Sequence, residues 1–305
     1  MTGGIDRDEV AAQVAASMRG FSIEVTPREL DSIGAIEDML PEATPVFITW
    51  LPNASFEGTV AAARRIADAG LVPVPHLAAR AVQSEQQIED LVGAVAEQAG
   101  VRRVLAIAGS VDEVAGPFPA TIDLLRTGVM QRHGISWVGV AGHPEGSPDV
   151  GDAALVQAIT DKNAFAVESG LDVHLVTQFC FAPEPVVIWE RSIRAAGNHL
   201  PVHVGLPGAA SAATLLKFGL RCGVGPSLAV MRKRASSVLK LASAKPQYPE
   251  ATVTGVAAAA VQDAGSSFAP FHFFPFGAFA RTAAWARAIA DGRFAMPSDD
   301  RIVVD

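Results

Sequence analysis

The stretch Val173-His174-Leu175-Val176-Thr177-Gln178-Phe179 decides the fold, because an apolar run that predicts a buried strand ends there in a Thr-Gln pair. In a parallel α/β barrel, catalytic side chains lie at the carboxyl ends of the strands. Five other strand-like runs also finish in a polar residue, at Glu24, Thr49, His76, Ser110 and His143. This recurrence indicates a site built from several strand ends.

Short Val-, Ile- and Leu-rich runs alternate with longer runs rich in Ala, Glu and Arg, which is the pattern of βα units. Strands are predicted at residues 21–25, 45–50, 71–76, 103–108, 136–141, 172–179, 200–205 and 270–274. Helices are predicted at 56–69, 85–99, 121–132, 153–169, 184–196, 211–218, 227–241 and 278–290. Eight strands separated by helices predict an α/β fold, a (β/α)8 TIM barrel.

The seventh crossover is longer than the others and predicts extra helices. Residues 242–265 have room for two or three helices, which we interpret as an elaboration packed on the barrel. Two domains would also fit 305 residues, but one barrel with extensions is the preferred interpretation. We therefore predict a single catalytic domain over 1–305, with 1–19 as an N-terminal extension and 291–305 as a C-terminal tail.

Composition excludes several classes of function. The net charge is −8 and Lys and Arg are not clustered, which argues against nucleic-acid binding. The short basic run 231–234 is interpreted as a solvated helix face. Cys180 and Cys222 form no CxxC pair, which excludes thiolate zinc sites, and the histidines show no metal-ligand spacing, so no metal is predicted.

The chain shows no targeting or membrane signal. No segment offers about 18 uninterrupted apolar residues, so no membrane span is expected. The first eight residues carry acid and lack an apolar core, so they do not predict a secretory signal. We expect a cytoplasmic protein, and the apolar composition permits a homo-oligomer without requiring one.

Six short segments at predicted strand ends carry a family resemblance. They are Phe21-Ser22-Ile23-Glu24-Val25-Thr26-Pro27-Arg28, Pro75-His76-Leu77, Ala106-Ile107-Ala108-Gly109-Ser110, Ala141-Gly142-His143-Pro144-Glu145, Thr177-Gln178-Phe179-Cys180-Phe181 and Phe271-His272-Phe273-Phe274. In this order they resemble motifs of the methylenetetrahydrofolate reductase family, in its short bacterial form with a catalytic domain alone. The resemblance extends from about residue 20 to 290 and implies the barrel fold.

The resemblance implies reduction of 5,10-methylenetetrahydrofolate to 5-methyltetrahydrofolate, with NADH as electron source and, in most members, bound FAD. The imidazolidine ring of the folate must open before hydride reaches the bridging carbon, and opening needs a proton on the departing nitrogen. A desolvated carboxylic acid can supply that proton. Glu24 is the candidate on an otherwise apolar first strand, and the alternative is a carboxylate paired with Arg28 at the barrel rim.

Gln178 is the second catalytic candidate. Its amide both donates and accepts hydrogen bonds, which suits the edge of a pterin and the orientation of a nicotinamide or flavin. The alternative is a strand-end amide that caps the next helix. The resemblance places Thr49, His76 and His143 at the flavin, whereas a histidine at a strand end also suits a structural hydrogen bond.

The chain departs from the family at the fourth strand, where Arg-Gly-Asp is replaced by Ala108-Gly109-Ser110. The family position implies cofactor contacts for all three residues and a substrate contact for Ser110, while Phe273 is assigned to the substrate. Ala cannot pair with a pyrophosphate as Arg does. Substitute positive charge is expected from Lys162, or from Arg80 or Arg281.

Two further interpretations stay open. The chain also fits a folate-dependent methyl-transfer or demethylation partner, or a flavin-free barrel that binds folate. No GxGxxG motif follows the first strand, so NADH is expected to bind across the barrel mouth rather than in a Rossmann domain. Without flavin, hydride would pass directly from NADH or NADPH to the folate, and the sequence does not distinguish the two nucleotides.

Overall fold

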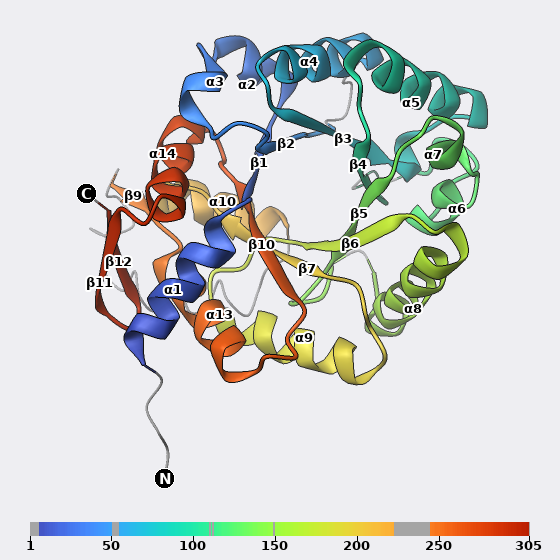
Figure 1. Cartoon of the computed structure of the whole chain (residues 1–305). Coiled ribbons are helices and arrows are strands. Elements are labelled where there is room, and N and C mark those ends of the chain that lie inside the picture. Colours follow the sequence, from blue (N-terminus) through green and yellow to red (C-terminus); the bar gives the residue numbers. More distant parts are fainter. Residues whose placement is uncertain are drawn as a thin grey trace. The chain divides into compact units, whose positions relative to one another are not determined.

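The computed structural model describes residues 6–50, 55–109, 111, 113–148, 150–222 and 245–304. Eight of the strands in this part of the chain form a closed barrel in the order β1-β10-β7-β6-β5-β4-β3-β2 (Figure 1). They are β1 Ser22–Val25, β2 Pro45–Ile48, β3 Val72–Ala78, β4 Arg103–Ile107, β5 Trp137–Gly142, β6 Asp172–Thr177, β7 Val202–Pro207 and β10 Phe268–Phe274. The predicted parallel (β/α)8 barrel is therefore confirmed.

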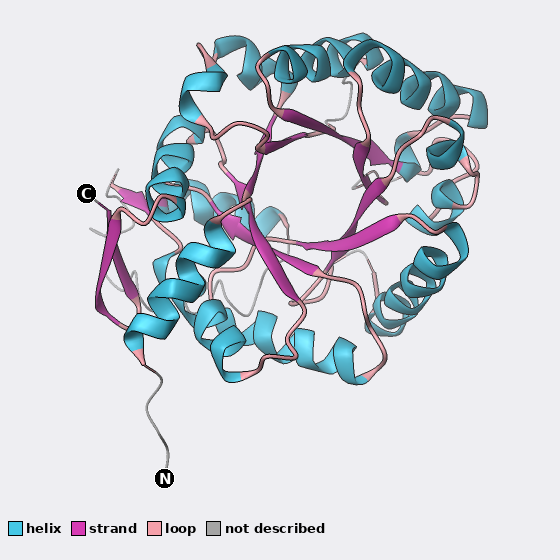
Figure 2. Ribbon diagram, in the orientation of Figure 1, coloured by secondary structure: helices cyan, strands magenta, loops and turns pink. Residues whose placement is uncertain are grey.

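Helices flank the strands (Figure 2). They are α1 Arg7–Met18, α2 Pro27–Ser32, α3 Ile36–Met39, α4 Phe56–Asp68, the 3-10 turn η1 Ala79–Ala81, α5 Glu85–Ala99, α6 Thr121–Leu125, α7 Val129–Arg132, α8 Asp152–Ser169, α9 Pro183–Ala195, α10 Ala212–Arg221, α13 Glu250–Gln262 and α14 Phe279–Ala290. The helix predicted at 227–241 lies outside the described residues. None of the helices in the described part of the chain is long and apolar enough to cross a membrane.

The chain forms two compact units. The first, called here the β1–β5 unit, comprises Ser22–Gly142 and Val156–Val176, and the second, the C-terminal unit, comprises Met1–Phe21, His143–Leu155 and Thr177–Asp305. In the β1–β5 unit, successive strands pair in parallel, and Glu24 is level with Phe47 of β2. Its core cluster consists of Phe47, Val74, Leu105 and Val176.

The segment between β1 and β2 is held by hydrogen bonds that the sequence analysis did not anticipate. Thr26 and Glu29 form a capping box that starts α2, with Pro27 in the first turn. The guanidinium of Arg65, on α4, donates to the carbonyl oxygens of Leu30, Ile33 and Gly34 at 2.6, 2.5 and 3.1 Å. Arg65 thereby holds the C-terminal end of α2 and the two residues after it against α4.

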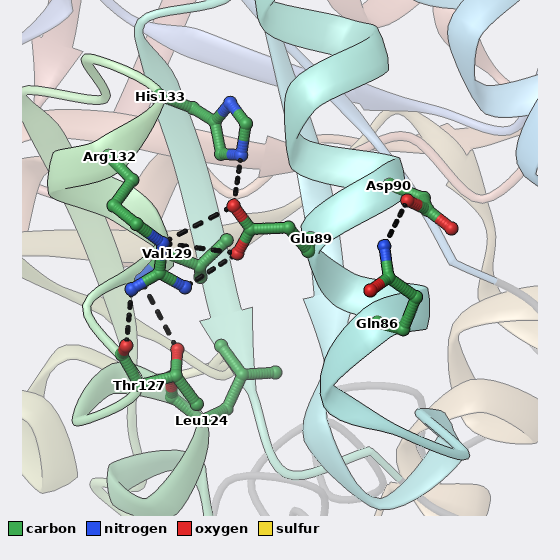
Figure 3. Close-up of polar contacts among 8 residues, drawn as sticks. All are labelled: Gln86, Glu89, Asp90, Leu124, Thr127, Val129, Arg132 and His133. Carbon is green, nitrogen blue, oxygen red and sulfur yellow. Dashed lines mark hydrogen bonds and ion pairs between the residues drawn. The ribbon is translucent and has the colours of Figure 1, made fainter.

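Residues 121–132, predicted as one helix, form the two short helices α6 and α7. The break falls at Gly128, whose φ of +76° is left-handed. Glu89 of α5 then fixes α7: its carboxylate accepts from Arg132 at 2.5 Å and contacts His133 Nε2 at 2.8 Å (Figure 3). The Arg132 hydrogen bond is the main reason that the pKa of Glu89 falls to about 2.

In the C-terminal unit, the segments predicted as extensions contain regular structure. Residues 1–19 include α1, which packs on α13 and α14 through Val10, Val14 and Met18. Residues 245–265, the described part of the predicted elaboration, contain the single helix α13. The predicted tail forms an antiparallel hairpin, β11 Phe294–Ser298 with β12 Arg301–Val304. A shorter pair joins β8 Ala210–Ser211 to β9 Pro246–Gln247.

Candidate active site

Three of the predicted strand-end residues meet in the β1–β5 unit. Glu24 on β1 lies with one carboxyl oxygen 3.4 Å from His76 Nε2 on β3. Thr49, directly after β2, donates its hydroxyl to the other carboxyl oxygen at 3.3 Å. The side chains of Glu24 and His76 are 13% and 5% exposed, so this cluster is largely shielded from water.

Neighbouring strands fix this cluster. Thr49 continues the pairing of β2 with β1, because its N–H donates to Val25 O at 2.9 Å. The edge of the Phe47 ring meets the His76 ring, with centroids 6.0 Å apart. Burial places the Glu24 carboxyl group and the His76 imidazole in a medium of low dielectric, which strengthens the interaction between them. The arrangement can hold and release one proton at the end of β1.

Ala108 and Gly109 follow β4 directly. The Ala108 carbonyl accepts from the Arg80 N–H at 2.9 Å. Gly109 has a φ of +88°, and a Cβ there would lie 3.1 Å from the Cβ of Ala78. Only glycine fits this turn without strain. Ser110, predicted to contact both cofactor and substrate, lies outside the described residues.

Lys162 on α8 is a buried cation beside β5, only 7% exposed. Its Nζ donates to the carbonyl oxygen of Ala141 at 2.7 Å. Burial lowers its pKa to about 8, while the Asp161 carboxylate acts in the opposite direction. Within the described residues Nζ makes this one hydrogen bond, so two of the three donors of its ammonium group are left for an anion.

His143, predicted at the cofactor, opens a turn in the C-terminal unit, where its carbonyl accepts from Gly146 N–H at 3.1 Å. Glu145 in the same turn interacts with Cys180. Burial raises the pKa of the Cys180 thiol, and the adjacent Glu145 carboxylate raises it further. Glu145 and Cys180, which come from two of the sequence motifs, are therefore in contact within this unit.

Gln178 does not cap the following helix. Its side-chain Oε1 accepts from the N–H of Phe179 at 3.1 Å, and α9 begins without a side-chain cap. The Thr177 hydroxyl donates to Gln178 O and accepts from Gly205 N–H, both at 2.8 Å. Among the described residues, the amide nitrogen of Gln178 makes no hydrogen bond. The donor end of this amide is thus available to a ligand.

An aromatic cluster at the ends of β6 and β10 was not predicted from the sequence. Phe179 contacts Phe181, Phe274 and Phe276 with centroid distances of 5.5, 5.6 and 4.9 Å. Phe276 adopts a left-handed φ of +50°, which costs free energy in a non-glycine residue. The signal in the sequence was the density of phenylalanine at 179–181 and 271–276.

Phe273 has a different environment from this aromatic cluster. It is fully buried, and its ring packs edge-on against Phe21 at 5.9 Å and Trp285 at 6.1 Å. These are the contacts of a core residue between β10 and α14. We therefore do not include Phe273 among the substrate contacts proposed below.

A cavity of about 490 Å³ lies in the β1–β5 unit, beyond the ends of β2, β3 and β4. Its lining residues are Trp50, Ser55, Phe56, Arg80, Ala81, Gln83, Gln87, Val111, Glu113 and Ala115. Of these, Arg80 alone was predicted as a site residue, as a source of positive charge. The cavity walls come from separate loops, so no motif marks them.

His174 takes part in a separate cluster near the amino ends of the strands. It lies 2.7 Å from Asp172 and stacks on Trp137, which Arg103 in turn covers at 6.0 Å. In barrels of this kind that end serves stability. Within the described residues, no three His, Cys, Asp or Glu side chains come together as a potential metal site.

The fold and the polar strand ends define a (β/α)8 barrel with a carboxyl–imidazole pair at the end of its first strand. Residues 21–228 match the methylenetetrahydrofolate reductase family, and the chain belongs to this family. Among solved structures, it is similar to the xylose isomerase domain protein from Planctomyces limnophilus. The identity is 11%, with 89% of this chain and 95% of that chain covered, and the TM-score is 0.37.

Proposed function

We propose that this chain, acting as one catalytic domain, reduces 5,10-methylenetetrahydrofolate to 5-methyltetrahydrofolate with electrons from NAD(P)H, FAD as carrier and Glu24 as general acid. Membership of the family supports the folate substrate and the reductase class. The observation that most strongly supports the residue assignment is the largely buried Glu24–His76 pair at the end of β1.

Glu24 delivers the proton that opens the imidazolidine ring. Opening converts the bridging carbon into an iminium that accepts hydride, and the departing nitrogen must be protonated as its bond breaks. A carboxyl group that is 13% exposed can hold such a proton away from bulk water. Thr49 and His76 act as positioning residues, because each contacts one oxygen of this carboxyl group.

Gln178 orients the folate through its free amide nitrogen. The Phe179 N–H holds the Oε1 atom, which fixes the plane of the amide before substrate binds. A preset donor suits an acceptor on the pterin edge. Ser110 is proposed as a further contact for substrate and cofactor.

The residues after β4 and β5 fit a flavin in part. Gly109 exposes backbone in a turn that rejects a side chain, and Lys162 offers two donors to an anionic group. Ala108 offers no charge. We propose Thr49, His76, His143 and these three residues as the cofactor contacts. When bound, the flavin would accept hydride from the nicotinamide and transfer it to the substrate.

The test is anaerobic NADH oxidation with 5,10-methylenetetrahydrofolate, on protein as purified and with added FAD. The decisive variant is Glu24→Gln, and Glu37→Gln, an exposed carboxylate on α3, is the matched control. We expect folate-dependent turnover that collapses in Glu24→Gln and persists in Glu37→Gln. Turnover by Glu24→Gln at the wild-type rate would remove Glu24 from its role.

Absence of folate-dependent oxidation by the wild-type protein, with and without FAD, would overturn the reductase assignment. The yellow absorbance of the purified protein and the FAD dependence of the rate then separate flavin-mediated from direct hydride transfer. If the purified protein binds no FAD and added FAD does not change the rate of folate reduction, hydride passes directly from NADH to the folate. Glu24 and Gln178 then keep their proposed roles.

A further inference from the structure

We propose that the 490 Å³ cavity binds the adenosine diphosphate moiety of a dinucleotide, with Arg80 on the diphosphate and the Trp50–Phe56 corner on the adenine. This inference rests on the proposed function, because NAD(P)H and FAD both contain this moiety. The cavity is formed by residues of the β1–β5 unit alone.

The cavity has the size of a small-molecule site. Such sites measure roughly 300–1,000 Å³ and combine apolar walls with a few placed polar groups. Here Trp50 and Phe56 form an aromatic corner, with centroids 5.4 Å apart and planes tilted by 46°. Both rings are only partly buried, so they retain surface for a base. Stacking on such rings is a common way to hold a purine.

Arg80 supplies the positive charge. Its backbone is fixed from both sides, since its N–H donates to Ala108 O and its carbonyl accepts from Ala115 N–H, both at 2.9 Å. Within the described part of the chain, its guanidinium makes no hydrogen bond or ion pair. A guanidinium on a fixed backbone can bind phosphate oxygens with two parallel hydrogen bonds.

The remaining polar groups fit a ribose. Gln87 Oε1 is held by the Gln83 N–H at 2.6 Å, which leaves the amide nitrogen of Gln87 as a donor. Glu113 is the only acidic side chain among the described lining residues. A carboxylate accepts hydrogen bonds from ribose hydroxyls and repels a 2′-phosphate. The cavity therefore favours NADH over NADPH if the moiety comes from the nicotinamide nucleotide.

The cavity is connected through the chain to the Glu24 cluster. Trp50 is the residue after Thr49, and Arg80 lies on η1, directly after the strand that carries His76. A dinucleotide anchored here by its adenosine end would extend its reactive ring along the same two strand ends. In this arrangement the cavity holds the adenosine end of the dinucleotide, and the reaction takes place at the Glu24 cluster.

The first test measures Kd values by calorimetry for ADP, NADH, NADPH and FAD on the full chain. The variants are Arg80→Gln and Trp50→Leu, and Arg64→Gln, an exposed arginine on α4, is the control. Loss of one charged phosphate contact should weaken ADP binding about ten-fold or more in Arg80→Gln, with Arg64→Gln unchanged. Arg80→Lys keeps the charge without the fork and should bind with intermediate affinity.

The source of the moiety follows from which dinucleotide loses affinity in Arg80→Gln. Loss for NADH alone assigns the cavity to the nicotinamide nucleotide, and loss for FAD alone assigns it to the flavin. Wild-type affinity of a folded Arg80→Gln variant for ADP, NADH and FAD would overturn the inference. Folate-dependent NADH oxidation is assayed separately. If that activity is absent but ADP binding still depends on Arg80, the reductase assignment is wrong and the cavity inference stands. If the activity is present but ADP binding does not depend on Arg80, the cavity inference is wrong.

Discussion

Thr177 is the residue whose replacement should most clearly link the fold to the site. Its hydroxyl is buried, with the residue 1% exposed, and it both accepts from Gly205 N–H and donates to Gln178 O at 2.8 Å. Thr177→Val replaces the hydroxyl by a methyl group of similar size. The substitution therefore removes two hydrogen bonds without creating a cavity.

The free-energy cost of Thr177→Val comes from the Gly205 N–H, which loses its hydrogen-bond acceptor. A buried N–H without a partner costs about 1–3 kcal/mol, and Gly205 N–H would be in that state. Gly205 cannot move away freely, because it is tightly packed: a Cβ on it would lie only 2.4 Å from Thr177 O. We expect a destabilisation of about 2 kcal/mol and, for a chain of 305 residues, a drop in Tm of about 3 °C. Release of the Gln178 carbonyl should also lower kcat.

The assay is urea unfolding, with kcat measured on the same samples. Thr177→Ser keeps the hydroxyl and should retain kcat, losing about 1 kcal/mol for the missing methyl group. Gly151→Ala, where a Cβ meets nothing within 4 Å, controls for general effects of substitution in this unit. If Thr177→Val matches the wild type in both urea midpoint and kcat, the clamp between β6 and β7 has no energetic role.

Three other perturbations test separate parts of the structure. Arg65→Met removes three hydrogen bonds to carbonyl groups and should cost about 1–3 kcal/mol in urea unfolding, whereas exposed Arg64→Met should be neutral. Burial lowers the pKa of His174, so wild-type Tm should fall as pH drops below about 6.5, where the unfolded chain binds a proton first; His174→Gln should flatten this decline. Burial lowers the pKa of Lys162 to about 8. Between pH 8 and about 10.5 the unfolded chain therefore binds more protons at this residue than the folded chain, so the stability of the wild type should rise with pH over this range. The variant Lys162→Met should lack this rise.

The strands could be predicted from the sequence because each is a short apolar run, and six of the eight runs are followed by or end in a polar residue. Their ends differ by one or two residues, as for β7, which begins at Val202 rather than at residue 200. The short helices after β1 were missed, although Thr26 and Glu29 carry the same capping-box spacing as Ser84 and Gln87. Six and four residues are too few for helical periodicity to be visible.

The N-terminal helix was missed for a different reason. Val10, Val14 and Met18 recur every four residues and are buried against α13 and α14. The spacing was present in the sequence, but Ala and polar residues between these positions weaken the apolar face. Only the partner helices, which come more than 200 residues later, explain why this segment folds.

Within the site, the sequence predicted which strand ends carry polar groups but not what each group does. Of the Thr-Gln pair, a catalytic role was predicted for Gln178 alone. In the structure, the Thr177 hydroxyl bonds to Gly205 and Gln178, whereas the amide nitrogen of Gln178 has no hydrogen-bond partner among the residues that the structure describes. The Thr177 hydroxyl therefore stabilises the fold, and the Gln178 amide is the group proposed to bind the substrate.

The same division of roles explains why the cavity was not predictable. The backbone of Arg80 is fixed by Ala108 and Ala115, residues with no chemical signature. In the described part of the chain the Arg80 guanidinium has no hydrogen-bond partner. A charged side chain becomes a binding group only where the backbone is held and no internal partner competes for the charge. The sequence shows that residue 80 is an arginine. The packing of the loops that follow β2, β3 and β4 determines whether its guanidinium can bind a ligand.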